Sequence, residues 1–251
     1  MRELSAAPYF TLNPFLELFR TGVPILMYHK IGPRPPGVRL KGLYLSVANF
    51  VRQLGEFQVA GFASCTLAEA CAGGSGGPRV ALTFDDGFCN VLENALEPLA
   101  QHRLRAIQFL VPDAIGKLNE WDLRDGEVPE RLMDASQIRL WLQAGHAIGS
   151  HSLTHARLTR LSVRDAREEI FASKKTLEDT FAVPVDHFCY PYGDWNPAVR
   201  DLVMEAGYRT ACTTAFGINT PATPPLALRR LTVRHPTRSL RSLKAKLLGP
   251  D

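Results

Sequence analysis

Short apolar runs alternate with longer helical patterns along most of the chain, and this alternation limits the possible folds more than any other feature. The run 79–84 (RVALTF) is typical of a buried strand, whereas 162–181 has a helical repeat that begins at Ser162. Strands that alternate with helices form parallel sheets. About seven such units occur, as expected of a (β/α) barrel. The expected strands are 23–28, 79–84, 105–111, 146–151, 185–193 and 208–214, and the expected helices are 46–61, 90–104, 135–145, 162–181 and 196–207.

Length and composition suit one α/β domain. We assign residues 1–251 to a single domain with a core at about 22–234, because 251 residues with 45% hydrophobic content can bury a sizeable core. The net charge of +4 is mild, and no zinc-finger, RNP or helix-turn-helix pattern accompanies it, so no nucleic-acid partner is expected. No G-x-G-x-x-G or P-loop follows a strand, which argues against a nucleotide-binding doubly wound fold.

Two further features concern the cellular context. The five cysteines form no CxxC pair, which favours reduced thiols over a disulfide framework or a zinc cluster. Residues 1–29 contain neither a signal-peptide pattern nor a membrane-spanning run, so we expect a cytoplasmic protein, with the inner face of the membrane as an alternative location. The tail 239–248 predicts a basic amphipathic helix that packs on the barrel or, alternatively, docks on a membrane surface or anionic glycan. The sequence does not indicate an oligomeric state.

Polar and aromatic side chains follow four of the expected strands. In a parallel barrel the carboxyl ends of all strands lie on one face, and active sites form there. Their convergence is stronger support for a site than any single motif, since two adjacent acids before a glycine are by themselves typical of a solvated turn. The residues concerned are His29, Asp85, Asp86, His151, His155, Gly193, Asp194 and Trp195.

This residue set predicts a catalytic metal site. His151 and His155 are four residues apart, and one carboxylate from Asp85 or Asp86 completes three ligands that leave positions open for water and substrate. Zn²⁺ is the first expectation, with Co²⁺, Ni²⁺ or Mn²⁺ as alternatives for mixed nitrogen and oxygen ligands. The second carboxylate is then available to take a proton from the metal-bound water as it attacks.

The motifs together resemble the polysaccharide deacetylase family, the NodB-homology domain of carbohydrate esterase family 4. T-F-D-D-G at 83–87, H-S-L-T-H at 151–155 and Y-P-Y-G at 190–193 match its motifs in order, and L-M-Y-H at 26–29 resembles the branch whose domain starts with that strand. The resemblance covers about residues 22–234. It implies a NodB-like distorted (β/α) barrel of seven or eight strands.

The resemblance also implies roles for individual residues. Asp85 is the general base, the backbone N–H of Tyr192 helps to hold the developing oxyanion, and His29 protonates the leaving amine. The metal ligands implied are Asp86, His151 and His155.

Two departures from the family pattern affect the base and the acid. The segment 186–193 lacks the arginine that the family places near the base, and no late Leu-x-His motif supplies an acid. Arg229 and Arg230 offer a partial replacement for the arginine, although a solvated pair is the favoured interpretation. We assign the acid to His29, with His235 as the rival.

Four aromatic and proline residues complete the predicted substrate contacts. Trp121, in the polar stretch 116–133, and Trp195 are candidates for stacking on a sugar ring, with rim aromatics that cover a barrel edge as the alternative. The third motif adds Tyr190 and Pro191 to the residues expected at the substrate.

The leading functional hypothesis is a metal-dependent hydrolase that removes N-acetyl groups from amino sugars of the N-acetylglucosamine type. Its substrate would be a polysaccharide or glycan precursor, and the metal-bound water would be the nucleophile. One alternative is an amidohydrolase acting on another amide, such as a formamido sugar or a cyclic imide. Another is a glycan-binding module without catalysis, which the intact carboxylate pair and histidine pair argue against, because binding needs no base.

Overall fold

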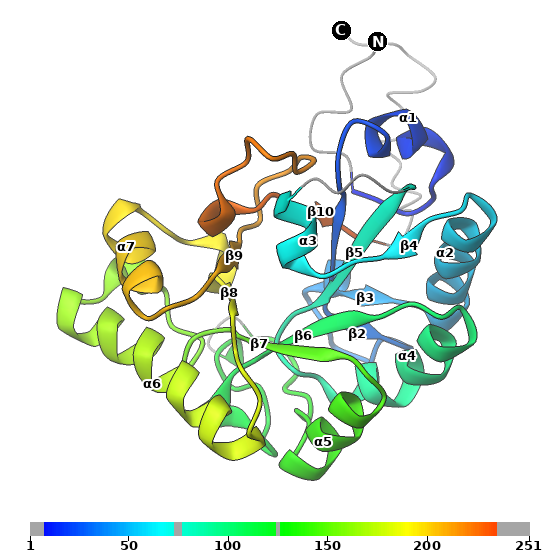
Figure 1. Cartoon of the computed structure of the whole chain (residues 1–251). Helices are drawn as coiled ribbons and strands as arrows, with labels where there is room; N and C mark the ends of the chain where they lie inside the picture. Colours follow the sequence, from blue (N-terminus) through cyan, green and yellow to red (C-terminus); the bar gives the residue numbers. More distant parts are fainter. Residues whose placement is uncertain (1–7, 73–76, 124–125, 235–251) are drawn as a thin grey trace, which may run out of the picture.

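A curled, parallel sheet forms the centre of the computed structural model, which describes residues 8–72, 77–123 and 126–234 (Figure 1). Its strands follow the order β10-β1-β5-β6-β7-β8-β9, with β4 paired to β5, and every pairing is parallel. This path confirms the expected distorted (β/α) barrel of about seven strands. The strands are β1 (Ile25–Tyr28), β4 (Ala63–Ser64), β5 (Arg79–Phe84), β6 (Ala106–Leu110), β7 (Ala147–Ser150), β8 (His187–Cys189), β9 (Thr210–Cys212) and β10 (Leu231–Thr232).

Helices α2, α4, α5, α6 and α7 lie around the outside of the curled sheet, whereas α3 lies at its open side (Figure 1) and contributes Leu67 and Ala70 to the smaller of two cores. Side-chain caps define where two of the longer ones begin: Ser162 accepts a hydrogen bond from the N–H of Asp165, as the sequence predicts, and Asp134 forms a capping box with Gln137. The helices are α1 (Leu16–Phe19), α2 (Val47–Val59), α3 (Leu67–Ala72), α4 (Cys89–Gln101), α5 (Ala135–Gln143), α6 (Val163–Phe181) and α7 (Pro197–Glu205).

Strand alternation divides the buried residues into two cores. Leu82 and Phe84 of β5 belong to the larger core beneath the helices, whereas Ala81 belongs to a smaller one. The smaller core contains Ile107 and Phe109 of β6. Because successive side chains of a strand face opposite sides, the smaller core fills the inside of the curl. The central strands β5 and β6 are therefore buried on both faces, which explains their continuous apolar runs.

Three of the shortest strands were not predicted from the sequence. β2 (Lys30–Ile31) pairs with β3 (Tyr44–Leu45) in a separate two-stranded sheet, and β4 is also two residues long. β10 is equally short but falls in the run 231–233 (LTV), which the sequence does predict as a strand. Two residues contain no readable period. The predicted helix at 239–248 lies outside the described residues. All five cysteines are free thiols, and no described helix has the length and apolar character needed to cross a membrane.

A buried ion pair ties β2 to the stretch 116–133. The ammonium of Lys30 lies 2.7 Å from Oε1 of Glu130 and 3.2 Å from the hydroxyl of Tyr44, which itself donates to Glu130. The second oxygen of Glu130 accepts from Nδ2 of Asn90 on α4 at 3.2 Å. Only 1% of the Lys30 side chain is exposed, so its charge depends on these partners.

Replacing Lys30 should therefore destabilise the protein strongly. Lys30→Met leaves the carboxylate of Glu130 without its cation, and we expect the free energy of unfolding to fall by about 3–5 kcal/mol in urea titrations. The matched control is Lys175→Met, which removes an exposed pair with Asp179 on α6 and should change stability by less than about 1 kcal/mol. Equal effects of the two variants would contradict the structural role of Lys30.

Candidate metal and catalytic site

A cavity of about 410 Å³ opens at the carboxyl ends of the central strands. It brings together residues that follow β1, β5, β7 and β8. Two residues from outside the motifs also line it: Trp121 from the stretch 116–133, and Arg230, which precedes β10. The site residues that line it are His29, Asp85, Asp86, Trp121, His151, His155, Tyr190, Tyr192 and Arg230. Pro191 and Trp195 do not line it.

The backbone turns sharply where the two acids leave β5. Neighbouring side chains of an extended strand would face opposite sides, yet Asp85 and Asp86 both reach the cavity, because Asp86 adopts φ 77°. Gly87 follows at φ 90°, where glycine is favoured. His155 (φ 66°) and Tyr192 (φ 61°) have left-handed conformations as well. Such conformations are uncommon for residues other than glycine and concentrate at functional sites.

Asp86, His151 and His155 form a ligand set that fits a divalent metal ion. Oδ1 of Asp86 lies 3.3 Å from Nε2 of His155 and 3.5 Å from Nε2 of His151, and all three residues are buried. Within the described part of the chain this buried oxygen has no hydrogen-bond partner. Three converging nitrogen and oxygen atoms of this kind are typical of a catalytic site that keeps positions open for other ligands.

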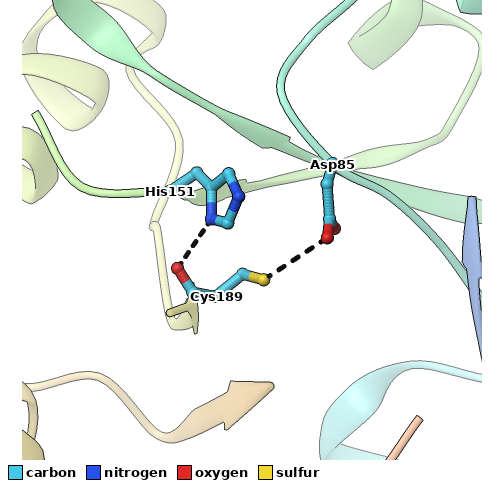
Figure 2. A group of neighbouring side chains, drawn as sticks. All are labelled: Asp85, His151 and Cys189. Atoms are coloured by element: carbon cyan, nitrogen blue, oxygen red, sulfur yellow. Dashed lines mark hydrogen bonds between the residues drawn. The ribbon is translucent and has the colours of Figure 1, made fainter. Parts of the chain in front are cut away.

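The protonation of His151 suits metal binding. Its Nδ1 lies 2.7 Å from the backbone oxygen of Cys189 (Figure 2), so an N–H there donates to the carbonyl. This leaves the Nε2 lone pair toward Asp86. Burial, followed by the charge of His155, lowers the pKa of His151 to about 4. The ring is therefore neutral at pH 7 and available as a ligand.

Arg230 is the main partner of Asp85. Its Nη1 lies 2.7 Å from Oδ1 and its Nη2 lies 2.8 Å from Oδ2, and both side chains are almost completely buried. Burial alone would raise the pKa of Asp85, but the charge and hydrogen bonds of Arg230, with smaller contributions from His29 and His151, hold that pKa below its usual value. The carboxylate is thus ionised at neutral pH, as a base must be.

From the sequence, this position of Arg230 was only the less favoured alternative. The favoured interpretation, a solvated pair of Arg229 and Arg230, is wrong for Arg230 and right only in that Arg229 is exposed. Arg230 occupies an inward position just before β10, two residues after buried Leu228, and this alternation is the only local signal in the sequence that distinguishes the two arginines.

Cys189 is a second site residue that the motifs did not single out. Its thiol lies 3.7 Å from Oδ2 of Asp85 and its backbone oxygen holds His151, as Figure 2 shows. Asp85, His151 and Cys189 are close enough to suggest an alternative metal site. However, Nη2 of Arg230 lies 3.1 Å from the sulfur and is bonded to Asp85, so a cation is already present there. Of the two groups, the one with Asp86 therefore fits a divalent ion better.

The remaining predicted residues are divided between the cavity and its surroundings. His29 is partly exposed to the cavity, with Nε2 3.8 Å from Oδ2 of Asp85, whereas the rival His235 lies outside the described residues. The hydroxyl of Tyr190 donates to the backbone oxygen of Leu226 at 3.0 Å and is not available to a substrate. Trp195 stacks on Tyr190 outside the cavity lining.

Comparisons with known proteins agree with this geometry. The sequence model of a family described as polysaccharide deacetylase matches residues 72–211. A chitooligosaccharide deacetylase of Sinorhizobium fredii is 31% identical over 139 residues, which is 53% of this chain and 56% of that protein. A peptidoglycan-N-acetylglucosamine deacetylase of Listeria monocytogenes is 27% identical over 50% of this chain and 24% of its own length. The chain thus spans about half, or less, of these curated relatives.

A solved structure extends the similarity to most of the described barrel. A polysaccharide deacetylase from Bacillus cereus superimposes with a TM-score of 0.73 at 27% identity, covering 86% of this chain and 66% of that one. The deacetylase PplD of Streptococcus pyogenes has the same TM-score at 22% identity and covers 84% of this chain, a level that speaks for the fold alone.

The pair of Asp85 and Arg230 makes a prediction about stability. Arg230→Met leaves a buried carboxylate without its cation, and we expect the free energy of unfolding at pH 7 to fall by about 3–5 kcal/mol. Adding Asp85→Asn removes the isolated charge, so the double variant should be more stable than Arg230→Met alone in urea titrations. A double variant that is less stable than the single one would contradict the pairing.

The same pair predicts the direction of a pH effect. Because the folded-state pKa of Asp85 lies below its usual 3.8, its contribution to stability is present above pH 3.8 and is lost as the pH falls through the lower folded value. Without Arg230, burial raises the pKa of Asp85. The stability difference between the wild type and Arg230→Met should therefore begin to narrow above pH 3.8, as Asp85 of the variant takes up its proton, and should go on narrowing until the pH falls through the lower folded value of the wild type.

Proposed function

The chain belongs to the polysaccharide deacetylase family, and we propose that it is a metal-dependent N-deacetylase acting on N-acetylglucosamine-type sugars of a polysaccharide or glycan precursor. The observation that carries this proposal is that two adjacent carboxylates in one cavity have different partners. Asp85 is paired with Arg230, whereas Oδ1 of Asp86 faces two histidine nitrogens. The printed names of the two curated relatives, which concern chitooligosaccharide and peptidoglycan N-acetylglucosamine, support an N-acetylated amino sugar as substrate.

A metal ion at this ligand set would have two chemical roles. A divalent cation held by Asp86, His151 and His155 would supply a Lewis acid that polarises the acetamide carbonyl and lowers the pKa of an attacking water. Zn²⁺ is our first choice, with Co²⁺, Ni²⁺ and Mn²⁺ as alternatives.

The protein's own residues would handle the protons and the developing charge. Asp85 accepts a proton from the water whose oxygen adds to the carbonyl carbon, and the backbone N–H of Tyr192 donates to the carbonyl oxygen as it becomes negative. His29, which faces the cavity beside Asp85, then donates a proton to the amide nitrogen as the carbon–nitrogen bond breaks. The products are acetate and a free amino sugar.

The first test separates the two carboxylates. Asp85→Asn should lower kcat for acetate release from chitooligosaccharides by about 10²–10⁴-fold, because it removes the base, while the bound metal content stays at the wild-type level. Asp86→Asn, the matched control, should lose both activity and metal. Full activity of Asp85→Asn would refute the assigned base, and a wild-type protein without metal or acetate release would favour the glycan-binding alternative.

The second test identifies the acid. His29→Ala should lower kcat by about 10²-fold or more, because the leaving nitrogen then departs without a positioned proton donor. His235→Ala is the control for the rival assignment and should leave kcat unchanged. Initial rates of acetate release measured for both variants, with metal content checked alongside, would reverse the assignment if only His235→Ala is impaired.

A further inference from the structure

The two histidines of the proposed ligand set are supported in different ways. Nδ1 of His151 is fixed by the backbone oxygen of Cys189 at 2.7 Å. Nδ1 of His155 is also buried, but it has no hydrogen-bond partner among the described residues. Metal-binding histidines almost always use their second nitrogen for a hydrogen bond that orients the ring, so His155 must be held by something else.

Two aromatic rings contact the imidazole of His155. Trp121 stacks on the His155 ring, with centroids 4.5 Å apart and planes at 20°. The ring of Tyr192 meets the same imidazole edge-on, at 4.6 Å and 69°. Contacts of both kinds are favourable arrangements for aromatic rings. Together they oppose rotation of the imidazole, which would swing Nε2 away from Asp86.

The loop that carries Trp121 is itself anchored. The N–H of Asn119 bonds to the backbone oxygen of Glu130 at 3.0 Å, and the Asn119 side chain accepts from the N–H of Glu130 at 2.6 Å. Glu130 is in turn held by the buried ammonium of Lys30. The backbone is therefore held in place at Asn119, two residues before Trp121, and this limits where the indole can lie.

We propose that Trp121 is a positioning residue for the metal ligand His155, replacing the hydrogen bond that the imidazole lacks. This role differs from the sugar stacking expected from the sequence, since one face of the indole is covered by His155. The inference rests on the metal site of the proposed function but not on its substrate. A residue that only contacts sugar would affect KM and leave metal affinity unchanged.

Metal affinity of the whole 251-residue chain tests this inference without reference to catalysis. The chain is stripped with a chelator and titrated with Zn²⁺ in competition with a metal indicator, for the wild type, Trp121→Ala and Trp121→Phe. The control is Trp195→Ala, which removes a partly exposed indole that stacks on Tyr190 outside the cavity. Circular dichroism of each variant reports whether it is folded.

We expect Trp121→Ala to weaken Zn²⁺ binding about 10-fold, at the lower end of losses from supporting groups of metal ligands, with Trp121→Phe restoring most of the affinity. Trp195→Ala should bind Zn²⁺ as the wild type does. Unchanged affinity in Trp121→Ala would overturn the inference, as would an equal loss in Trp195→Ala. If Trp121→Ala fails to fold, Trp121→Leu takes its place, and unchanged Zn²⁺ affinity in that folded variant would overturn the inference. Absence of Zn²⁺ binding by the wild type would refute the metal site of the proposed function, a separate result.

Discussion

The buried pair of Arg230 and Asp85 is the interaction on which the site depends. The two residues are 145 positions apart in the chain, and Arg230 also bonds to the side chain of Thr83 at 3.0 Å and to the backbone oxygen of Thr213 at 2.8 Å. A buried guanidinium is tolerated only when its donors are satisfied. These bonds therefore fix the carboxyl ends of β5 and β9 relative to the start of β10. Because β9 and β10 are the first and last strands of the sheet order, Arg230 links the two edges of the curled sheet.

This arrangement divides the labour between two neighbouring carboxylates. Asp85 has a cation that belongs to the protein, so its charge does not depend on a bound metal. Asp86 has no such partner: burial would raise its pKa, but the nearby imidazole of His155, with the charges of His29 and His151, holds that pKa well below its usual value. A carboxylate that is ionised, buried and short of hydrogen bonds at one oxygen is well suited to bind a metal ion.

Sequence reasoning predicted those parts of the site that local pattern determines. The acids and histidines could be found because each follows a strand with a clear apolar run, and the family motifs carry their spacing. Arg230 could not, because β10 has only two residues and the choice between Arg229 and Arg230 depends on which one faces inward. The stacking of Trp121 on His155 was also beyond reach, because nothing local fixes where the stretch 116–133 folds back.

The fold likewise followed the strength of the local signal. Helices with side-chain caps, such as α6 after Ser162, were predicted close to their observed bounds. The sheet of β2 and β3 was missed, although it brings Lys30 and Tyr44 to Glu130. The ion pair of Lys30 and Glu130 joins residues 100 positions apart, and no local repeat in the sequence indicates such a contact. It affects the site indirectly, through the stretch that carries Trp121.

Tyr192 shows how one residue can serve the site through both its backbone and its side chain. Its left-handed backbone, at φ 61°, costs of order 1–3 kcal/mol unless surrounding contacts favour it. The contacts present are the ring of His155 on one side and the guanidinium of Arg157, 3.7 Å from the centroid of the tyrosine ring. The packing that steadies a proposed metal ligand is therefore the same packing that offsets the strain of the turn bearing the proposed oxyanion donor. A change in either aromatic contact should consequently affect metal binding and amide polarisation together.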